Sequence, residues 1–226
     1  MPIRRVVPAI LTDNEVALDR MVRQTEQFTS WAQFDIMDGI FVPPESIRAD
    51  HITASMPDME YDAHLMVVHP ETYIEGFRLA GARRVTFHFE VCSDPIDWVQ
   101  FIKKQGMEAG LALNPDTPVT VIEPELAEQV DIILLLSVNP GYYGSPFIPE
   151  VTDKVNALRT NFPGIRLGMD GGIKADNIHT IARLGVDEIC VGSAIFGQED
   201  PGAAYQHLMT LAKDGWQQYC EDSLEK

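Results

Sequence analysis

The feature that most constrains the fold is a unit that recurs along the whole chain: a short apolar run, a polar turn, and a stretch with helical periodicity. Runs of this length that are rich in Val, Ile, Leu and Phe and bounded by turn residues predict buried strands. Eight strands are expected, at residues 6–11, 33–36, 61–65, 85–89, 108–113, 132–137, 166–169 and 188–191.

Helical stretches separate these strands, for example at residues 14–28 and 70–80. A glycine stands before four of the expected strands, at Gly81, Gly106, Gly164 and Gly185. The end of a helix often needs a residue in the left-handed region, so we expect these glycines to terminate helices. Eight such units in 226 residues predict an α/β protein of the TIM (β/α)8 barrel type.

An open, doubly wound sheet is the competing architecture. It usually has fewer strands and a glycine-rich nucleotide loop after the first strand, whereas residues 11–14 here contain no glycine. No linker, low-complexity segment or charged tail marks a second domain. We therefore expect residues 1–226 to form a single barrel domain, with residues 221–226 frayed.

Charge and composition limit the possible partners. The formal net charge is −17 and the 17 Lys and Arg residues are scattered, so the chain lacks the basic footprint that nucleic acid requires. The amino-terminal residues do not resemble a signal peptide, and no apolar run is long enough to span a membrane. The three cysteines show no metal-like spacing and suit a reducing compartment, so we expect a cytoplasmic protein.

Polar residues stand where the expected strands end, which is where a barrel of this type places its active site. Asp35, His64 and Asp170 end the second, third and seventh strands. A carboxylate in a strand buried on both faces is costly unless it is paired, hydrogen-bonded or bound to metal. Two such carboxylates could act as base and acid around one carbon, or bind a metal with the histidine. Capping of the next helix is the simpler alternative for each aspartate.

Glycines recur in the three loops that follow the late strands, at residues 139–145, 170–172 and 192–194. Adjacent loops at this end of a barrel commonly bind phosphate, because backbone N–H groups can approach its oxygens. An anion also has to be held by such local groups, since the overall charge repels it. The expected phosphate-binding residues are Gly141, Tyr142, Tyr143, Gly144, Gly171, Gly172, Gly192 and Ser193.

Six motifs follow one another along the chain. They read DIMDGIFVP at 35–43, DAHLM at 62–66, LNPDTP at 113–118, SVNPG at 137–141 with FIP at 147–149, MDGG at 169–172 and GSAIFG at 192–197. In this order they resemble the motif set of the ribulose-phosphate 3-epimerase family, whose first three motifs are D-x-M-D-G-x-F-V-P, D-x-H-L-M and L-N-P-x-T-P. The resemblance extends from near residue 6 to residue 197, which is most of the chain.

The resemblance implies a reaction and a set of roles. It implies interconversion of D-ribulose 5-phosphate and D-xylulose 5-phosphate, in which Asp35 takes a proton from carbon 3 and Asp170 delivers one to the opposite face of an enediolate. It implies a divalent cation (Zn, Mn or Fe) bound by Asp35, His64 and Asp170 and acting as a Lewis acid, with His64 also beside the substrate. Met37 and Met66 match methionines that line the reacting centre. A homo-oligomer, a dimer or larger, is also implied.

Several positions depart from the family pattern. Gln33 stands where the family has its first histidine ligand, and a glutamine oxygen binds zinc more weakly than imidazole does, so the place of Gln33 in the metal set is open. The other departures are Ala9 for serine, Ile40 for histidine, Pro44 for asparagine, Leu136 for methionine and Tyr143 for glycine. Three functions remain open: this epimerase, an epimerase or isomerase of a different ketose phosphate, and a non-catalytic phosphosugar-binding homologue.

Overall fold

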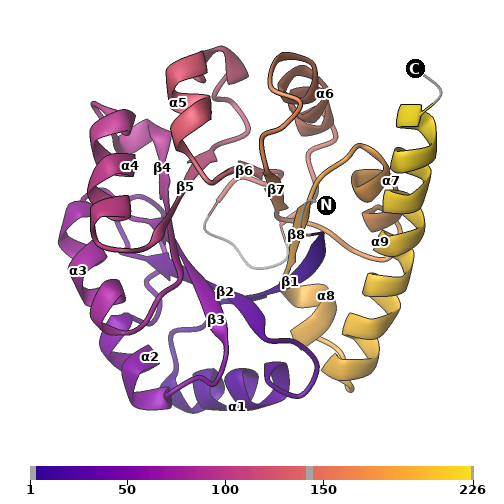
Figure 1. Ribbon diagram of the computed structural model, residues 1–226. Coiled ribbons are helices and arrows are strands. Elements are labelled where there is room, and N and C mark those ends of the chain that lie inside the picture. Colours follow the sequence, from indigo (N-terminus) through magenta and orange to yellow (C-terminus); the bar gives the residue numbers. More distant parts are fainter. Residues whose placement is uncertain (1–3, 141–144, 225–226) are drawn as a thin grey trace.

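The computed structural model describes residues 4–140 and 145–224, and its strands form a closed ring inside a ring of helices (Figure 1). The ring contains eight parallel strands in chain order, and β1 pairs with β8 to close it. The strands are β1 (Arg5–Ile10), β2 (Trp31–Met37), β3 (Glu60–Met66), β4 (Arg84–His88), β5 (Glu108–Leu113), β6 (Ile132–Leu136), β7 (Leu167–Asp170) and β8 (Glu188–Val191). The predicted barrel is confirmed, and all eight predicted strands are present.

The helices pack around the outside of the barrel. They are α1 (Glu15–Thr25), α2 (Ala49–Ser55), α3 (Glu71–Leu79), α4 (Pro95–Lys104), α5 (Pro124–Gln129), α6 (Val151–Asn161), α7 (Ile178–Arg183), α8 (Ser193–Phe196) and α9 (Pro201–Leu224), with 3-10 turns η1 (Phe89–Val91) and η2 (Val119–Val121). Residues 221–224, expected to be frayed, form the last turn of α9. Across the described chain, no helix combines the length and apolar character needed to cross a bilayer.

Three of the four glycines predicted to terminate helices adopt the left-handed conformation. Gly81, Gly106 and Gly185 have φ values of 87°, 83° and 85°. Gly164 does not, so the prediction was wrong at this position. The reason is that α6 ends earlier, at Asn161, and the backbone N–H of Phe162 already closes its last turn on Leu158.

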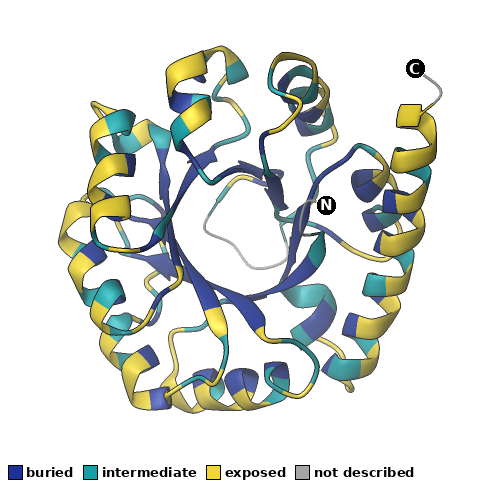
Figure 2. Ribbon diagram, viewed as in Figure 1, coloured by how far each residue is buried: buried dark blue, intermediate teal, exposed yellow. Residues whose placement is uncertain are grey.

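Alternate residues of each strand face two different layers. In β2, Phe34 and Ile36 pack in the core between the barrel and the helices, whereas Trp31 packs in a separate cluster inside the barrel. Figure 2 shows the strands buried along most of their length and the helices exposing their outer faces. Because side chains alternate along a strand, Gln33 and Asp35 point into the barrel interior above Trp31.

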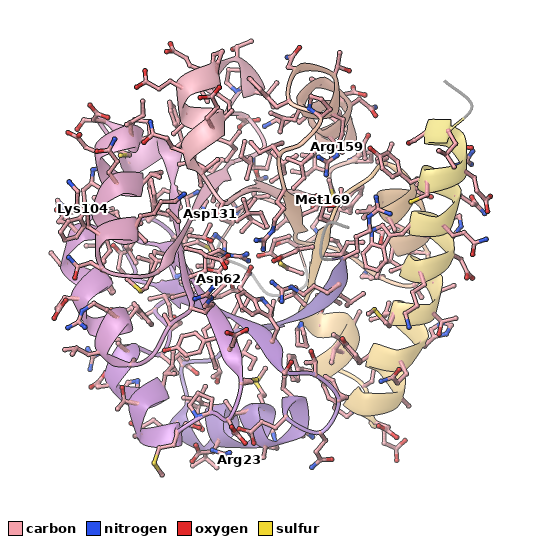
Figure 3. The ribbon with its side chains drawn as sticks, in the orientation of Figure 1. Arg23, Asp62, Lys104, Asp131, Arg159 and Met169 are labelled. Carbon is pink, nitrogen blue, oxygen red and sulfur yellow. The ribbon has the colours of Figure 1, made fainter. Side chains whose placement is uncertain are left out.

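Charged side chains fill the amino-terminal end of the barrel interior. Arg84 donates to Asp62 Oδ2 at 2.8 Å and to Glu188 Oε2 at 2.7 Å. Arg5 and Arg166 donate to Glu188 Oε1 at 2.7 and 2.5 Å. Asp62 is labelled inside the ring of strands in Figure 3. Each carboxylate of this network contacts a guanidinium group, so its buried charges are paired.

Candidate active site

Asp35, His64 and Asp170 come together at the carboxyl ends of β2, β3 and β7. Asp35 and His64 are direct partners in the register of β2 and β3. His64 Nδ1 lies 3.1 Å from Asp35 Oδ1 and 3.6 Å from Asp170 Oδ2. One potential ligand atom from each of the three residues lies within 4.8 Å of the others. The structure therefore brings the predicted acid–base pair and the predicted metal ligands into one cluster.

Hydroxyl groups from neighbouring segments fix the backbone of both aspartates. Ser46 Oγ donates to the carbonyl oxygen of Asp35 at 2.8 Å. Ser137 Oγ donates to the carbonyl oxygens of Asp170 and Gly171 at 3.0 and 2.7 Å. Neither aspartate occupies the N-cap of the following α-helix, so helix capping does not explain them.

Gln33 bridges the two aspartates from one layer deeper in the barrel. Its Nε2 donates to Asp35 Oδ1 and to Asp170 Oδ2, each at 2.8 Å, and its Oε1 accepts from Cys190 Sγ at 3.1 Å. The Gln33 side chain is fully buried. Burial also raises the pKa of the Cys190 thiol well above its ordinary value, so the thiol keeps its proton. Gln33, left open from the sequence, thus contacts both predicted catalytic groups.

Burial and proximity determine the ionisation of the cluster. The Asp35 and Asp170 side chains are only 10% and 14% exposed. Burial, reinforced by the charge of Asp35, raises the pKa of Asp170 above its ordinary value. Burial alone would lower the pKa of His64, but its hydrogen bond to Asp35 and the charges of both aspartates outweigh this and raise it. A carboxyl group with a raised pKa beside a second carboxyl is suited to proton transfer.

The donor set fits a divalent cation. Two carboxylates and one imidazole suit Zn²⁺, Mn²⁺ or Fe²⁺. In the part of the chain that the structure describes, neither Asp35 nor Asp170 forms a salt bridge with lysine or arginine. Two neighbouring buried carboxylates that share one histidine are still unfavourable, and a bound cation relieves that cost. Asp35, His64 and Asp170 therefore meet the chemical requirements of a metal site.

His88 and Glu90 extend the cluster away from the aspartates, although neither was among the predicted site residues. His88 Nε2 lies 3.0 Å from His64 Nε2, and His88 Nδ1 lies 3.2 Å from Glu90 Oε2. Burial, with the nearby His64, lowers the pKa of His88 to about 4, so the ring is neutral at physiological pH. A neutral His88 can accept a hydrogen bond from His64 Nε2–H and donate one from its own Nδ1–H to Glu90. This arrangement would hold His64 Nδ1 toward the aspartates.

A pocket opens over the cluster and includes the other predicted site residues that the structure describes. Gly171, Gly172, Gly192 and Ser193 line it, together with Met37 and Met66. The remaining predicted phosphate-binding residues, Gly141, Tyr142, Tyr143 and Gly144, lie outside the described residues. Of the departures from the family pattern, Ala9 and Leu136 line the pocket, whereas Ile40 and Pro44 do not. Among the described residues, only some of the departures from the family pattern therefore change the lining of the pocket.

The turn after β7 excludes side chains. Gly171 and Gly172 have φ values of 112° and 65°. A Cβ atom on Gly172 would lie 2.6 Å from the backbone nitrogen of Phe147. Close packing therefore requires glycine here, and the same lack of side chains leaves the backbone of the turn exposed to the pocket.

Known proteins resemble this chain in sequence and in fold. The model of the ribulose-phosphate 3-epimerase family matches residues 5–196. The cytoplasmic isoform of ribulose-phosphate 3-epimerase from Oryza sativa subsp. japonica is 38% identical over 90% of this chain and 92% of its own. The ribulose-phosphate 3-epimerase of Bacillus subtilis is 34% identical over 90% of this chain and 97% of its own.

Solved structures with low sequence identity share the fold. The 3-hexulose-6-phosphate synthase from Salmonella typhimurium has a TM-score of 0.71 and 16% identity, covering 93% of this chain and 99% of its own. The orotidine 5'-phosphate decarboxylase from Pyrococcus horikoshii has a TM-score of 0.65 and 16% identity, covering 92% of this chain and 99% of its own. At this identity the likeness concerns the barrel alone.

Proposed function

The chain belongs to the ribulose-phosphate 3-epimerase family, and from that premise we propose that it interconverts D-ribulose 5-phosphate and D-xylulose 5-phosphate. The observation that supports this reaction most directly is the pair Asp35 and Asp170, whose carboxyl oxygens lie within 4.8 Å at one pocket. Inversion at a carbon needs one group to remove a proton from one face and another to deliver a proton to the other.

Asp35 and Asp170 are the proton-transfer groups of the proposed mechanism. Asp35 removes the proton from carbon 3 of the ketose phosphate, and Asp170 delivers a proton to the opposite face of the enediolate. The two exchange roles in the reverse reaction. The raised pKa of Asp170 suits a group that starts protonated. Met37 and Met66, buried with Val42 at the mouth, present apolar surface that limits water near the reacting carbon.

Asp35, His64 and Asp170 would hold a divalent cation, Zn²⁺, Mn²⁺ or Fe²⁺. When bound, the cation supplies Lewis-acid stabilisation of the negative charge that develops on the substrate oxygens. His64 is held in place for this role by His88, which contacts its other ring nitrogen at 3.0 Å. His64 also borders the pocket beside the substrate.

The phosphate group would bind at the rim formed by the late loops. Gly171, Gly172, Gly192 and Ser193 line the pocket there. Gly141, Tyr142, Tyr143 and Gly144 stay predictions for the same site. Backbone N–H groups are the donors expected for an anion in a protein of net charge −17.

A cytoplasmic location and a homo-oligomeric state stay predictions, which cell fractionation and sedimentation would test.

A coupled assay tests the proposed reaction. Chelator-treated protein would be supplied with Mn²⁺, Fe²⁺ or Zn²⁺ and with D-ribulose 5-phosphate, and formation of D-xylulose 5-phosphate would be followed. The same reaction in deuterium oxide should place deuterium at carbon 3. Absence of both turnover and deuterium incorporation with all three cations would refute the proposal.

A different ketose phosphate is a second candidate substrate, because two departures from the family pattern, Ala9 and Leu136, line the pocket. They change the pocket surface while leaving the proton-transfer pair intact. A screen of ketose phosphates for solvent deuterium at the carbon beside the carbonyl would identify such a substrate. Thermal stabilisation by a sugar phosphate without any exchange would instead indicate a non-catalytic binding protein.

A further inference from the structure

The Gln33 carboxamide occupies a position where its two ends have different chemical neighbours. One end lies 2.8 Å from both Asp35 Oδ1 and Asp170 Oδ2, and the other lies 3.1 Å from Cys190 Sγ. An amide nitrogen only donates hydrogen bonds and an amide oxygen only accepts them. Facing two carboxyl groups, the nitrogen end donates two hydrogen bonds, which are charge-assisted where the carboxyl group is ionised, whereas the oxygen end would be repelled by a carboxylate.

A cation among Asp35, His64 and Asp170 reverses this preference. The amide N–H₂ group would then face a positive charge, whereas the amide oxygen would be a suitable ligand. Half a turn about the last side-chain bond of Gln33 exchanges the two ends without moving the rest of the side chain, and this torsion has a broad, roughly two-fold profile. The same side chain therefore fits both states of the site.

Cys190 allows the exchange at the far end of the amide. Its thiol donates to Gln33 Oε1 in the structure, and a thiol sulfur is also a weak acceptor for an N–H group. Cys190 is the register partner of Asp170 in β7 and β8, so its position is fixed by the barrel. After rotation the Gln33 nitrogen would still have a partner, which keeps a buried polar group from being left unpaired.

We propose that Gln33 is a two-state element of the metal site, bridging Asp35 and Asp170 through N–H when no cation is bound and ligating the cation through Oε1 when one is. This inference rests on the proposed cation of the epimerase reaction. It predicts a donor set of three oxygens and one nitrogen. A site with a second imidazole in place of the Gln33 oxygen would suit Zn²⁺ better, so the glutamine shifts the preference toward Mn²⁺ or Fe²⁺. The amide bridge also stabilises the cation-free state and lowers the affinity for the ion.

Nuclear magnetic resonance can observe the rotation directly. The side-chain amide signals of Gln33 would be assigned in ¹⁵N-labelled protein by their absence in Q33M. Addition of Zn²⁺, which is diamagnetic, to chelator-treated protein should move these proton signals upfield, because the two hydrogen bonds to carboxyl groups are lost. The amide signals of Gln206, an exposed side chain on α9, should not move.

Calorimetric titration with Mn²⁺ and Zn²⁺ gives a second measurement. Q33M keeps the side-chain length but removes both the ligand and the amide bridge. It should lower Mn²⁺ affinity about tenfold or more, because the lost ligand outweighs the lost bridge. Q33H should raise the affinity for Zn²⁺ relative to Mn²⁺, and Q206M should bind both ions as the wild type does. Q33E provides a second test in case Q33M fails to fold. Its carboxylate oxygens face Asp35 and Asp170, so the cation-free variant should be less stable than the wild type. The rise in Tm on adding Mn²⁺ should then be larger than for the wild type.

The outcomes separate this inference from the proposed reaction. Cation binding with unmoved Gln33 signals, or a Q33M variant that binds Mn²⁺ as tightly as the wild type, would overturn the two-state element and leave the epimerase intact. Failure to bind any cation would overturn it as well, whatever the coupled assay shows. Movement of the signals without turnover on ribulose 5-phosphate would support the two-state element and count against the reaction.

Discussion

The two ends of the barrel interior both bury carboxylates, but they differ in how those charges are paired. At the amino-terminal end, Asp62 and Glu188 are hydrogen-bonded to Arg84, and Arg5 and Arg166 add further pairing to Glu188. At the carboxyl end, the carboxylates meet a neutral amide and a histidine. A network whose charges are all paired is costly to break and leaves no charge for a cation, whereas an incompletely paired cluster is available to bind a cation or transfer a proton.

The same difference appears in the pKa values. Burial alone would raise the pKa of Glu188, but Arg84, Arg5 and Arg166 outweigh it and lower the pKa to about 2. Burial and the charge of Asp35 raise the pKa of Asp170. Glu188 therefore contributes stability that is lost as pH falls, and Asp170 in cation-free protein contributes stability that is lost as pH rises. The two ends respond to pH in opposite directions.

The largest effect is expected from D170N at the carboxyl end. Loss of a proton-transfer group should lower kcat by about 100-fold to 10,000-fold. The unfolding free energy of cation-free protein at neutral pH should not fall, because the substitution removes one of two neighbouring buried charges. Steady-state kinetics and urea unfolding measure the two quantities, with D214N on the exposed face of α9 as control. Wild-type turnover in D170N would place the acid–base role elsewhere.

The opposite result is expected from E188Q at the amino-terminal end. Removing one partner of a buried ion pair leaves Arg84 without full compensation, which should lower the unfolding free energy by about 3–5 kcal/mol. The kcat of the folded variant should be unchanged, since Glu188 lies at the other end of the barrel. Urea unfolding would be compared with E128Q, an exposed position on α5. A loss of kcat with unchanged stability would contradict the division of the two ends.

Acid pH should reduce the effect of E188Q. The pKa of Glu188 is lowered from 4.5 to about 2, so its contribution is present above pH 4.5 and is lost as pH falls toward about 2. The difference in unfolding free energy between the wild type and E188Q should therefore narrow over this range. Urea unfolding at a series of pH values measures it. A difference that stays constant down to pH 2 would show that the charge of Glu188 is not its source.

The smallest effect is expected from H88F, which removes the partner of His64 Nε2 while keeping a ring of similar size. Loss of a group that orients a metal ligand should weaken Mn²⁺ binding about tenfold to 100-fold. Calorimetric titration measures this, and H207F, an exposed position on α9, is the matched control. If H88F binds Mn²⁺ like the wild type, His88 is a packing residue alone.

His88 and Glu90 show where prediction from the sequence stops. The fourth strand was expected at residues 85–89, and β4 spans Arg84–His88. Side chains alternate along a strand, so whether His88 points into the barrel or toward the helices depends on the register and pairing of β4 rather than on the residue type. The convergence of Asp35, His64 and Asp170 was predictable, because their polar side chains end apolar strands and match a specific motif order.

By itself, the sequence determined the eight strands, three of the four glycines expected to end helices, and the types of side chain at the strand ends. Apolar runs and turn residues act locally, so they can be recognised along the chain. Only the tertiary structure decided that Gln33 joins Asp35, Asp170 and Cys190, and that Arg84 meets Glu188 at the other end. These contacts join residues up to 157 positions apart in the sequence, and the residues come within hydrogen-bonding distance only when β1 and β8 pair and close the barrel.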